Sequence, residues 1–291
     1  MRTKFLTPAL SLLLCVLRST QLNAQGYVEI LPDEVKRPFQ EKLMRISSEI
    51  RGSDSDEWEG LYTRYVGETW SESLFWTSND GFAAYRDTCS NGPRAWVNFG
   101  SAKFVNGVLV LDSEQNYTGE HSLSLKREYT PVKWGHQRWL IPTDELELFA
   151  HAVNSSSWED YESFYLRVDG NNDEPKGQPE IPNRFRHILD RKPIKAKVVA
   201  VGESSENRFG DVTIDVGKNK GVIVGMSFWL TGVKNTGVKI SVIRVNEKTA
   251  VAKIVSVGLS YDFDDDGNQM DADPPDFIPT PGMSFTNRVS N

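Results

Sequence analysis

The sequence predicts a mainly β protein with a few helices: an N-terminal helix and an antiparallel β-meander, followed by a small C-terminal β-barrel. Three observations predict this fold class. Short runs rich in β-branched and aromatic residues recur along most of the chain. Turn signals built from Gly, Asn, Asp and Pro separate these runs, and one apolar stripe with the period of a helix precedes them.

Residues 1–24 have the layout of a secretory signal peptide. Two basic residues open it, residues 6–17 form an apolar run, and Ala24 offers a cleavage point. The run is too short to span a bilayer comfortably, and Arg18 closes it. We therefore expect an exported protein, periplasmic or secreted, with no transmembrane segment after signal cleavage. An uncleaved anchor is the alternative, because Leu22 stands where a small residue is preferred.

Charge and cysteine content bear on partners and on the cellular compartment. The formal net charge of −7 becomes more negative once the basic signal segment is removed. An acidic chain repels nucleic-acid phosphates, so we expect no nucleic-acid partner. Cys89 is the single cysteine that follows the signal segment, so the fold relies on its core and not on disulfides. A disulfide-poor exported chain fits a bacterial envelope.

The first domain is predicted over residues 27–169. It opens with a helix, since five apolar residues recur at steps of four and three and share one face. These residues are Val35, Phe39, Leu43, Ile46 and Ile50. The meander covers 58–142, and Thr143 can cap a second, short helix. The strand-like runs of the meander are 73–76, 81–86, 95–99, 108–111, 122–126 and 138–141.

Residues 170–193 form the predicted linker, because Gly, Asn, Asp and Pro dominate its first half. The second domain, residues 194–291, is predicted to be a small β-barrel that carries an acidic loop at 261–276. Its expected strands are 196–201, 211–216, 226–230, 238–245, 250–257 and 283–286. The tetrapeptide Gly-Met-Ser-Phe begins at Gly225 and again at Gly282, each time entering a strand. Four residues alone do not establish a duplication.

Residues 212–226, VTIDVGKNKGVIVGM, combine a strand, a Gly-x-x-x-Gly-Val turn and a Gly-Met entry into the next strand. With the paired strands near 237–243 and 249–254, this stretch resembles small β-barrel modules of bacterial envelope proteins, such as the rod-shape protein MreC and the C-terminal module of the flagellar protein FlgT. The resemblance covers about residues 194–288 and implies protein contact or assembly. The membrane helix and coiled coil expected of the rod-shape protein do not stand out in the sequence, which argues against that particular role.

The acidic loop contains the sharpest candidate site. Three aspartates at every second position precede Gly267 and two more follow it, which matches the oxygen-ligand spacing and the sharp turn of calcium loops. They are Asp262, Asp264, Asp266, Asp271 and Asp273. Because exported proteins meet abundant calcium, Ca²⁺ is the candidate cofactor. A solvated acidic connection is the alternative, since Asp273 stands where a longer Glu is usual and Gln269 where an apolar residue often packs.

The first domain holds seven of the eight tryptophans. They are Trp58, Trp70, Trp76, Trp96, Trp134, Trp139 and Trp158. Core packing is the favoured interpretation, since aromatic residues suit strands and cores. Trp58, beside Gly60 and Tyr62, is then a buried anchor of a meander whose start is loosely similar to lipocalin-like barrels. Stacking of sugar rings on exposed tryptophans is the alternative.

We expect an exported envelope protein that acts as a binding or interaction module for a protein or an envelope polymer. The alternative is an exported carbohydrate-binding protein or hydrolase that uses the aromatic-rich first domain. No catalytic set stands out, because the histidines are scattered and Cys89 is best explained as a buried thiol. A cleft lined by tryptophan would favour the alternative, and a filled meander with a bare barrel edge would favour the module. The partner and the oligomeric state are open.

If the aspartates of the acidic loop bind Ca²⁺, the ion binds the folded state preferentially and raises its stability, by about 2.7 kcal/mol at a hundredfold excess over Kd. We expect the melting temperature to rise in millimolar calcium relative to chelator, and Asp264→Asn/Asp266→Asn to abolish the rise. Magnesium should act more weakly, because it demands a tighter octahedral shell. Identical melting with and without calcium, and no heat of binding, would leave a solvated connection.

Overall fold

The structure is a computed structural model. It describes residues 31–52, 57–66, 70–88, 96–114, 122–155, 163–170, 173, 175–202, 210–231, 238–256, 262–263, 269–270 and 279–288. Within these residues, no helix has the length and apolar character needed to cross a membrane.

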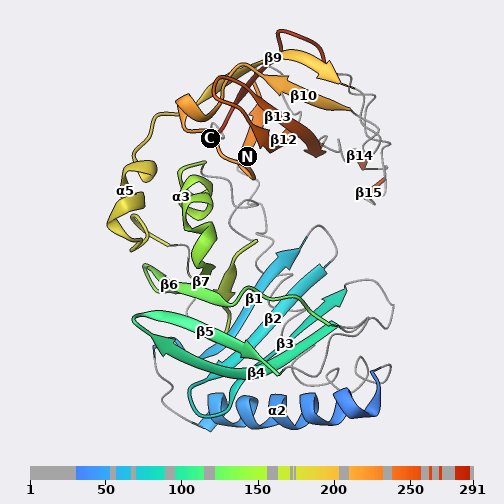
Figure 1. Ribbon diagram of the computed structural model, residues 1–291, viewed down its shortest axis with the longest axis vertical. Helices are drawn as coiled ribbons and strands as arrows, with labels where there is room; N and C mark the ends of the chain where they lie inside the picture. Colours follow the sequence, from blue (N-terminus) through green and yellow to red (C-terminus); the bar gives the residue numbers. More distant parts are fainter. Residues whose placement is uncertain are drawn as a thin grey trace. The chain divides into compact units, whose positions relative to one another are not determined.

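The chain divides into two compact units (Figure 1). The first comprises Met1–Thr143 and Ser163–Glu180, and the second comprises Asp144–Glu162 and Ile181–Asn291. The main boundary therefore falls at Glu180, inside the region predicted as a linker. The helix after Thr143, which the sequence placed in the first domain, belongs to the second unit.

The first unit is built around eight strands: β1 (Gly60–Val66), β2 (Trp70–Thr77), β3 (Gly81–Thr88), β4 (Trp96–Val105), β5 (Val108–Ser113), β6 (Glu128–Trp134), β7 (Gln137–Pro142) and β8 (Tyr165–Arg167). Each strand pairs antiparallel with the next, and β8 pairs with β1, which closes the sheet into a barrel. The predicted antiparallel meander is confirmed. The closure of its sheet into a barrel was not predicted from the sequence.

One strand of the meander is displaced from its predicted position. Of the expected run 122–126, Ser122 forms an isolated bridge with Val97, and the strand proper, β6, begins at Glu128. β6 contains Pro131, which has no N–H for a sheet ladder. The ladder between β5 and β6 ends at Tyr129, so the proline lies beyond it.

The helix α2 (Asp33–Gly52) covers the outer face of strands β2, β3 and β4 (Figure 1). Four of the five apolar residues that predicted this helix are buried against the strands, and Ile50 packs at their edge. The strand residues that receive them are Leu61, Phe75, Ala83, Val97 and Phe99. The predicted helix and its buried face are thus confirmed.

A second cluster of buried residues fills the barrel interior. Because side chains alternate between the two faces of a strand, the even-numbered residues of β1 to β4 point inward while the odd-numbered ones meet α2. The interior residues are Tyr62, Leu74, Trp76, Phe82, Ala84, Ala102, Leu109, Leu111, Leu123, Tyr129, Leu140 and Tyr165. An eight-stranded barrel is just wide enough for such side chains to fill it.

Among its described residues, the second unit contains two α-helices: α3 (Leu146–Ser155), which follows the 3-10 turn η1 (Thr143–Glu145), and α5 (Asn183–Leu189). α3 packs against α5. Asn154 Nδ2 donates to Arg191 O at 3.3 Å, and Arg288 Nε donates to Asn154 O at 2.9 Å. These bonds explain why the helix after Thr143 groups with the C-terminal part of the chain.

Six strands of the second unit form a second closed barrel, in the order β10-β13-β12-β11-β16-β9. Their bounds are β9 (Lys195–Gly202), β10 (Asp211–Ile214), β11 (Ser227–Leu230), β12 (Lys239–Val245), β13 (Ala250–Ser256) and β16 (Ser284–Thr286), with a 3-10 turn η2 (Lys218–Lys220). The predicted C-terminal barrel is confirmed. The short strands β14 (Asp262–Phe263) and β15 (Gln269–Met270) pair separately with each other.

The first and last strands of this barrel lie side by side. β9 pairs with β16, and Lys195 stands opposite Thr286. Next to this pair, Ile194 N donates to Asn287 Oδ1 at 2.6 Å, and Asn287 N donates to Ile194 O at 3.1 Å. The chain therefore enters and leaves the second barrel at neighbouring points.

The second barrel repeats one strand arrangement. β9 pairs with β10 as β12 pairs with β13, and β16 pairs with β9 as β11 pairs with β12. The two remaining pairs, β10–β13 and β11–β16, join equivalent strands to each other. Exchanging β9, β10 and β11 with β12, β13 and β16 leaves the pairing scheme unchanged.

The Gly-Met-Ser-Phe echo occupies equivalent places in this scheme. Gly225 and Gly282 both have positive φ, at 86° and 93°, which glycine adopts without steric cost. Gly225 N donates to Val242 O at 2.8 Å, and Gly282 N donates to Val198 O at 2.8 Å. Each valine N–H donates in return to the methionine carbonyl that follows the glycine. The echo in the sequence thus marks a structural repeat.

Truncation of Phe39, which is 1% exposed on α2, should test how strongly this helix is held to the barrel. We expect Phe39→Ala to lower the free energy of unfolding by about 3–5 kcal/mol, because it removes a large buried side chain and leaves a cavity. Met44, on the same helix, is 63% exposed, so Met44→Ala should change stability by less than about 0.5 kcal/mol. Equal losses in urea unfolding would contradict the packing of α2 described above.

Candidate functional site

The two ends of the first barrel differ in their connections. At one end the strands are joined by the tight turns 78–80, 106–107 and 135–136, and we call this the tight-turn end. At the other end they are joined by residues 67–69 and by the longer connections 89–95, 114–127 and 143–164, and we call this the long-connection end. Long connections on a rigid scaffold commonly carry binding residues.

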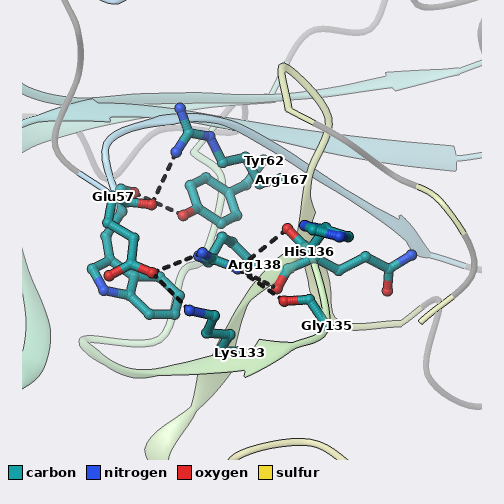
Figure 2. Close-up of polar contacts among 9 residues, drawn as sticks. Glu57, Tyr62, Lys133, Gly135, His136, Arg138 and Arg167 are labelled. Atoms are coloured by element: carbon teal, nitrogen blue, oxygen red, sulfur yellow. Dashed lines mark hydrogen bonds and ion pairs between the residues drawn. The ribbon is translucent and has the colours of Figure 1, made fainter. Parts of the chain in front are cut away.

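Ion pairs hold the tight-turn end together (Figure 2). The Glu57 Oε1 atom lies 2.7 Å from Arg138 Nη2 and 3.5 Å from Lys133 Nζ. Arg167 Nη1 donates to the main-chain oxygen of Glu57 at 2.9 Å. These contacts connect the residues that precede β1 to β6, β7 and β8, which meet at this end of the barrel.

Trp58 lies at the same end and is half-buried, so the prediction that it is a buried anchor is wrong. The guanidinium carbon of Arg138 lies 5.6 Å from the centroid of the Trp58 ring, which is a cation–π arrangement. Tyr62 Oη, from inside the barrel, donates to Trp58 O at 2.7 Å. The tryptophan covers the end of the interior core and keeps part of its surface in solvent, which is why it is not fully buried.

The long-connection end carries three charged side chains that point inward. Strand register places Arg64 opposite Glu72, and Glu72 opposite Arg86. Glu72 is 0% exposed. Its Oε2 accepts from Arg64 Nε at 2.7 Å and from Tyr165 Oη at 2.9 Å, and its Oε1 accepts from Arg86 Nε at 2.9 Å. We call Arg64, Glu72, Arg86 and Tyr165 the Glu72 cluster.

The protonation states of the Glu72 cluster follow from its burial and contacts. Burial alone would raise the pKa of the Glu72 carboxyl, but the charge of Arg64 and the hydrogen bonds from Arg86, Arg64 and Tyr165 outweigh it, and the pKa lies below its ordinary value. Burial raises the pKa of the Tyr165 hydroxyl well above 10.0, so it stays protonated and donates. The cluster therefore holds one carboxylate between two guanidinium groups.

Two tryptophans continue the cluster outward. Trp96 stands opposite Arg86 in the β3–β4 register, and the Arg86 guanidinium carbon lies 5.7 Å from its ring centroid. Trp70 meets Trp96 edge to face, with ring centroids 5.1 Å apart. Both tryptophans are half-buried, and the Arg64 and Arg86 side chains are 19% and 30% exposed. The long-connection end thus presents cationic and aromatic groups together to solvent.

The tryptophans as a group divide into two kinds. Trp76, Trp134 and Trp139 are buried, as core packing predicts. Trp58, Trp70 and Trp96 are half-buried, and they lie at the two ends of the barrel. Trp158 lies outside the described residues. Core packing therefore accounts for some of the aromatic residues, and partial exposure at the barrel ends for others.

The predicted calcium ligands are largely outside the described part of the chain. Asp264, Asp266, Asp271 and Asp273 lie outside it, and the backbone of Asp262 forms part of β14. Among the residues that the structure describes, no group of three or more His, Cys, Asp or Glu is placed to hold a metal ion. The calcium site stays a prediction from the sequence.

The histidines do not assemble a catalytic set in the described chain. His151 is buried on α3, and burial, then the charges of Arg191 and His187, lower its pKa from 6.5 to about 4. The ring is therefore neutral at neutral pH. His136 is exposed in the β6–β7 turn, whereas His121 and Cys89 lie outside the described residues.

Arg64, Glu72 and Arg86 are not among the site residues predicted from the sequence. The pattern that could have identified them is a charged residue at a position where an alternating strand faces the core. Arg64 is two residues from the inward-facing Tyr62, and Glu72 is two residues from the inward-facing Leu74, so each pair lies on the same face of its strand. A charged side chain that faces a core requires a partner of opposite charge, and here the adjacent strands supply that partner.

Comparison of the chain with models of known protein families, with curated proteins and with solved structures found no match.

Replacement of Glu72 by Gln should lower the free energy of unfolding, because Arg64 and Arg86 lose the carboxylate that compensates their partly buried charges. We expect a loss of about 3–5 kcal/mol in urea unfolding at neutral pH. Glu128→Gln, an exposed position on β6, is the control and should change stability by less than about 0.5 kcal/mol.

The pH dependence of the Glu72→Gln loss provides a second readout. Because folding lowers the pKa of Glu72, its contribution is complete above the ordinary value of 4.5 and is lost as the pH falls through the folded-state pKa. The difference between parent and Glu72→Gln should therefore shrink on acidification. A difference that persists unchanged at low pH would mean that the carboxylate charge is not its source.

Proposed function

We propose that the chain is an exported binding protein of the bacterial envelope, periplasmic or secreted, and that the long-connection end of its first barrel makes the binding contacts. The observation that carries the proposal is the meeting of Arg64, Arg86, Trp70 and Trp96, all partly exposed, at that end. Arginine and tryptophan are the side chains that most often dominate binding energy at interfaces.

The filled interior favours a binding surface at the rim of the barrel. Buried side chains from the strands occupy the interior, and the tight-turn end is held by ion pairs of Glu57 with Lys133 and Arg138. A ligand can therefore reach the partly exposed arginines of the Glu72 cluster and the two tryptophans from outside without displacing the core. The signal peptide predicted for residues 1–24 supports export of this binding domain.

A hydrolase is less well supported than a binding protein. A glycosidase needs one carboxyl with a raised pKa to act as an acid. Glu72 has the opposite property, because its pKa is lowered and its oxygens accept hydrogen bonds from Arg64, Arg86 and Tyr165. Its role is to hold the two arginines in place.

The second barrel supplies a further contact surface in this proposal. Its resemblance to envelope β-barrel modules supports contact with protein. Both barrels close on themselves among the described strands, so the bare edge expected of an interaction module is absent there. Contact would then be made by side chains and not by addition of a strand. Because the second barrel offers no bare edge among its described strands, the proposal assigns most of the binding contacts to the aromatic first barrel.

The proposal is tested by cell fractionation and cosedimentation. The exported protein should begin at Gln25, and the parent should sediment with a detergent-washed bacterial cell-wall fraction. Trp96→Ala should reduce sedimentation at least tenfold, because it removes a ring from the proposed surface. Trp58→Ala, a half-buried tryptophan at the tight-turn end, is the matched control and should sediment like the parent. Equal sedimentation of Trp96→Ala and the parent would contradict binding at the long-connection end.

A further inference from the structure

The chemistry of the long-connection end also indicates what it binds. Building on the proposed function, we infer that its ligand is an acidic saccharide, in which a sugar ring carries a carboxylate. The inference rests on three properties of the Glu72 cluster and its tryptophans: their charge, their hydrogen-bond donors and their ring faces.

The charge at this end favours a monoanion. Arg64 and Arg86 are both cationic and Glu72 is ionised, so one net positive charge remains among these inward-facing side chains. Among these described side chains, a neutral sugar would leave one positive charge without compensation in a partly desolvated place. One carboxylate on the sugar unit that contacts the arginines balances it, whereas a doubly charged phosphate at the same place would introduce an excess of negative charge.

The arginines retain donors for a carboxylate. Arg64 and Arg86 each use Nε and Nη2 to hold Glu72. Within the described chain, neither Nη1 atom forms a hydrogen bond that would occupy it. Because Glu72 fixes the guanidinium planes, these two groups are held in place before a ligand arrives, which lowers the entropic cost of binding. A guanidinium group matches the planar geometry of a carboxylate.

The tryptophans supply a platform for a sugar ring. Trp70 and Trp96 meet edge to face, so this contact leaves at least one ring face of each tryptophan uncovered. The C–H face of a pyranose packs well against such an amphipathic ring. The Arg86 guanidinium lies over the ring of Trp96, so the tryptophan pair and the cationic groups are adjacent. One acidic sugar unit can engage both at once.

A polyanion such as a nucleic acid fits less well than an acidic saccharide. The chain has a formal net charge of −7, which repels a dense row of phosphates. A ligand with few charges, each beside an apolar ring face, avoids this repulsion. The expected binding therefore weakens with salt but depends on the ring as well as on the charge.

The test is calorimetry of the mature chain with trigalacturonate and with the matched neutral trisaccharide, galactotriose. We expect trigalacturonate to bind at least tenfold more tightly than galactotriose. Arg64→Lys keeps the charge but loses the planar fork, and it should weaken binding of trigalacturonate about tenfold. Trp96→Ala should weaken it by a similar factor. Arg138→Lys and Trp58→Ala, the matched changes at the tight-turn end, should bind like the parent, with folding of every variant checked by thermal unfolding.

Several outcomes would overturn the inference and leave the proposed function standing. Equal affinity for both trisaccharides would remove the acidic group from the recognition. Competition by acetate as effective as that by galacturonate would show that an anion suffices and that the sugar ring is not recognised. Loss of cosedimentation after protease treatment of the cell wall would indicate a protein partner. The proposed function itself fails only if Trp96→Ala and the parent sediment equally with the untreated wall.

Discussion

Closure of the first barrel depends on β8, a strand of three residues. Leu166 pairs with residues of both β7 and β1, so a single residue connects the two sides of the sheet. Without it, β1 and β7 would be free edges with unpaired main-chain groups. Its neighbour Tyr165 donates to Glu72, so the strand that closes the barrel also helps to hold the carboxylate between Arg64 and Arg86.

Local patterns accounted for much of the fold. The spacing of Phe39 and Ile46 alone places them on one helical face, and both are buried. The Asn106-Gly107 turn has positive φ at both residues, as a tight hairpin requires, and it joins β4 to β5. These elements could be predicted because each is determined by residues close in sequence. β8 could not, since it is too short to show a pattern.

The Glu72 cluster could not be derived in the same way, because its contacts cross strands. The alternation of residues along each strand predicts that Arg64, Glu72 and Arg86 point inward. Whether the three side chains contact one another depends on the register of two hairpins, which the sequence does not specify. The repeat in the second barrel shows a similar limit. Four shared residues are too few to establish a repeat from the sequence alone. The equivalent hydrogen bonds of Gly225 and Gly282 in the structure establish it.

The adjacency of β9 and β16 has a consequence for how the second barrel can be used. Lys195 and Thr286 are cross-strand neighbours, and Ile194 and Asn287 hydrogen-bond to each other next to them. Such a unit is portable, because a host protein has only to offer two adjacent positions in a surface loop to accommodate it. The same proximity makes the barrel a good subject for circular permutation, in which a short linker joins the old ends and new ones open at another turn.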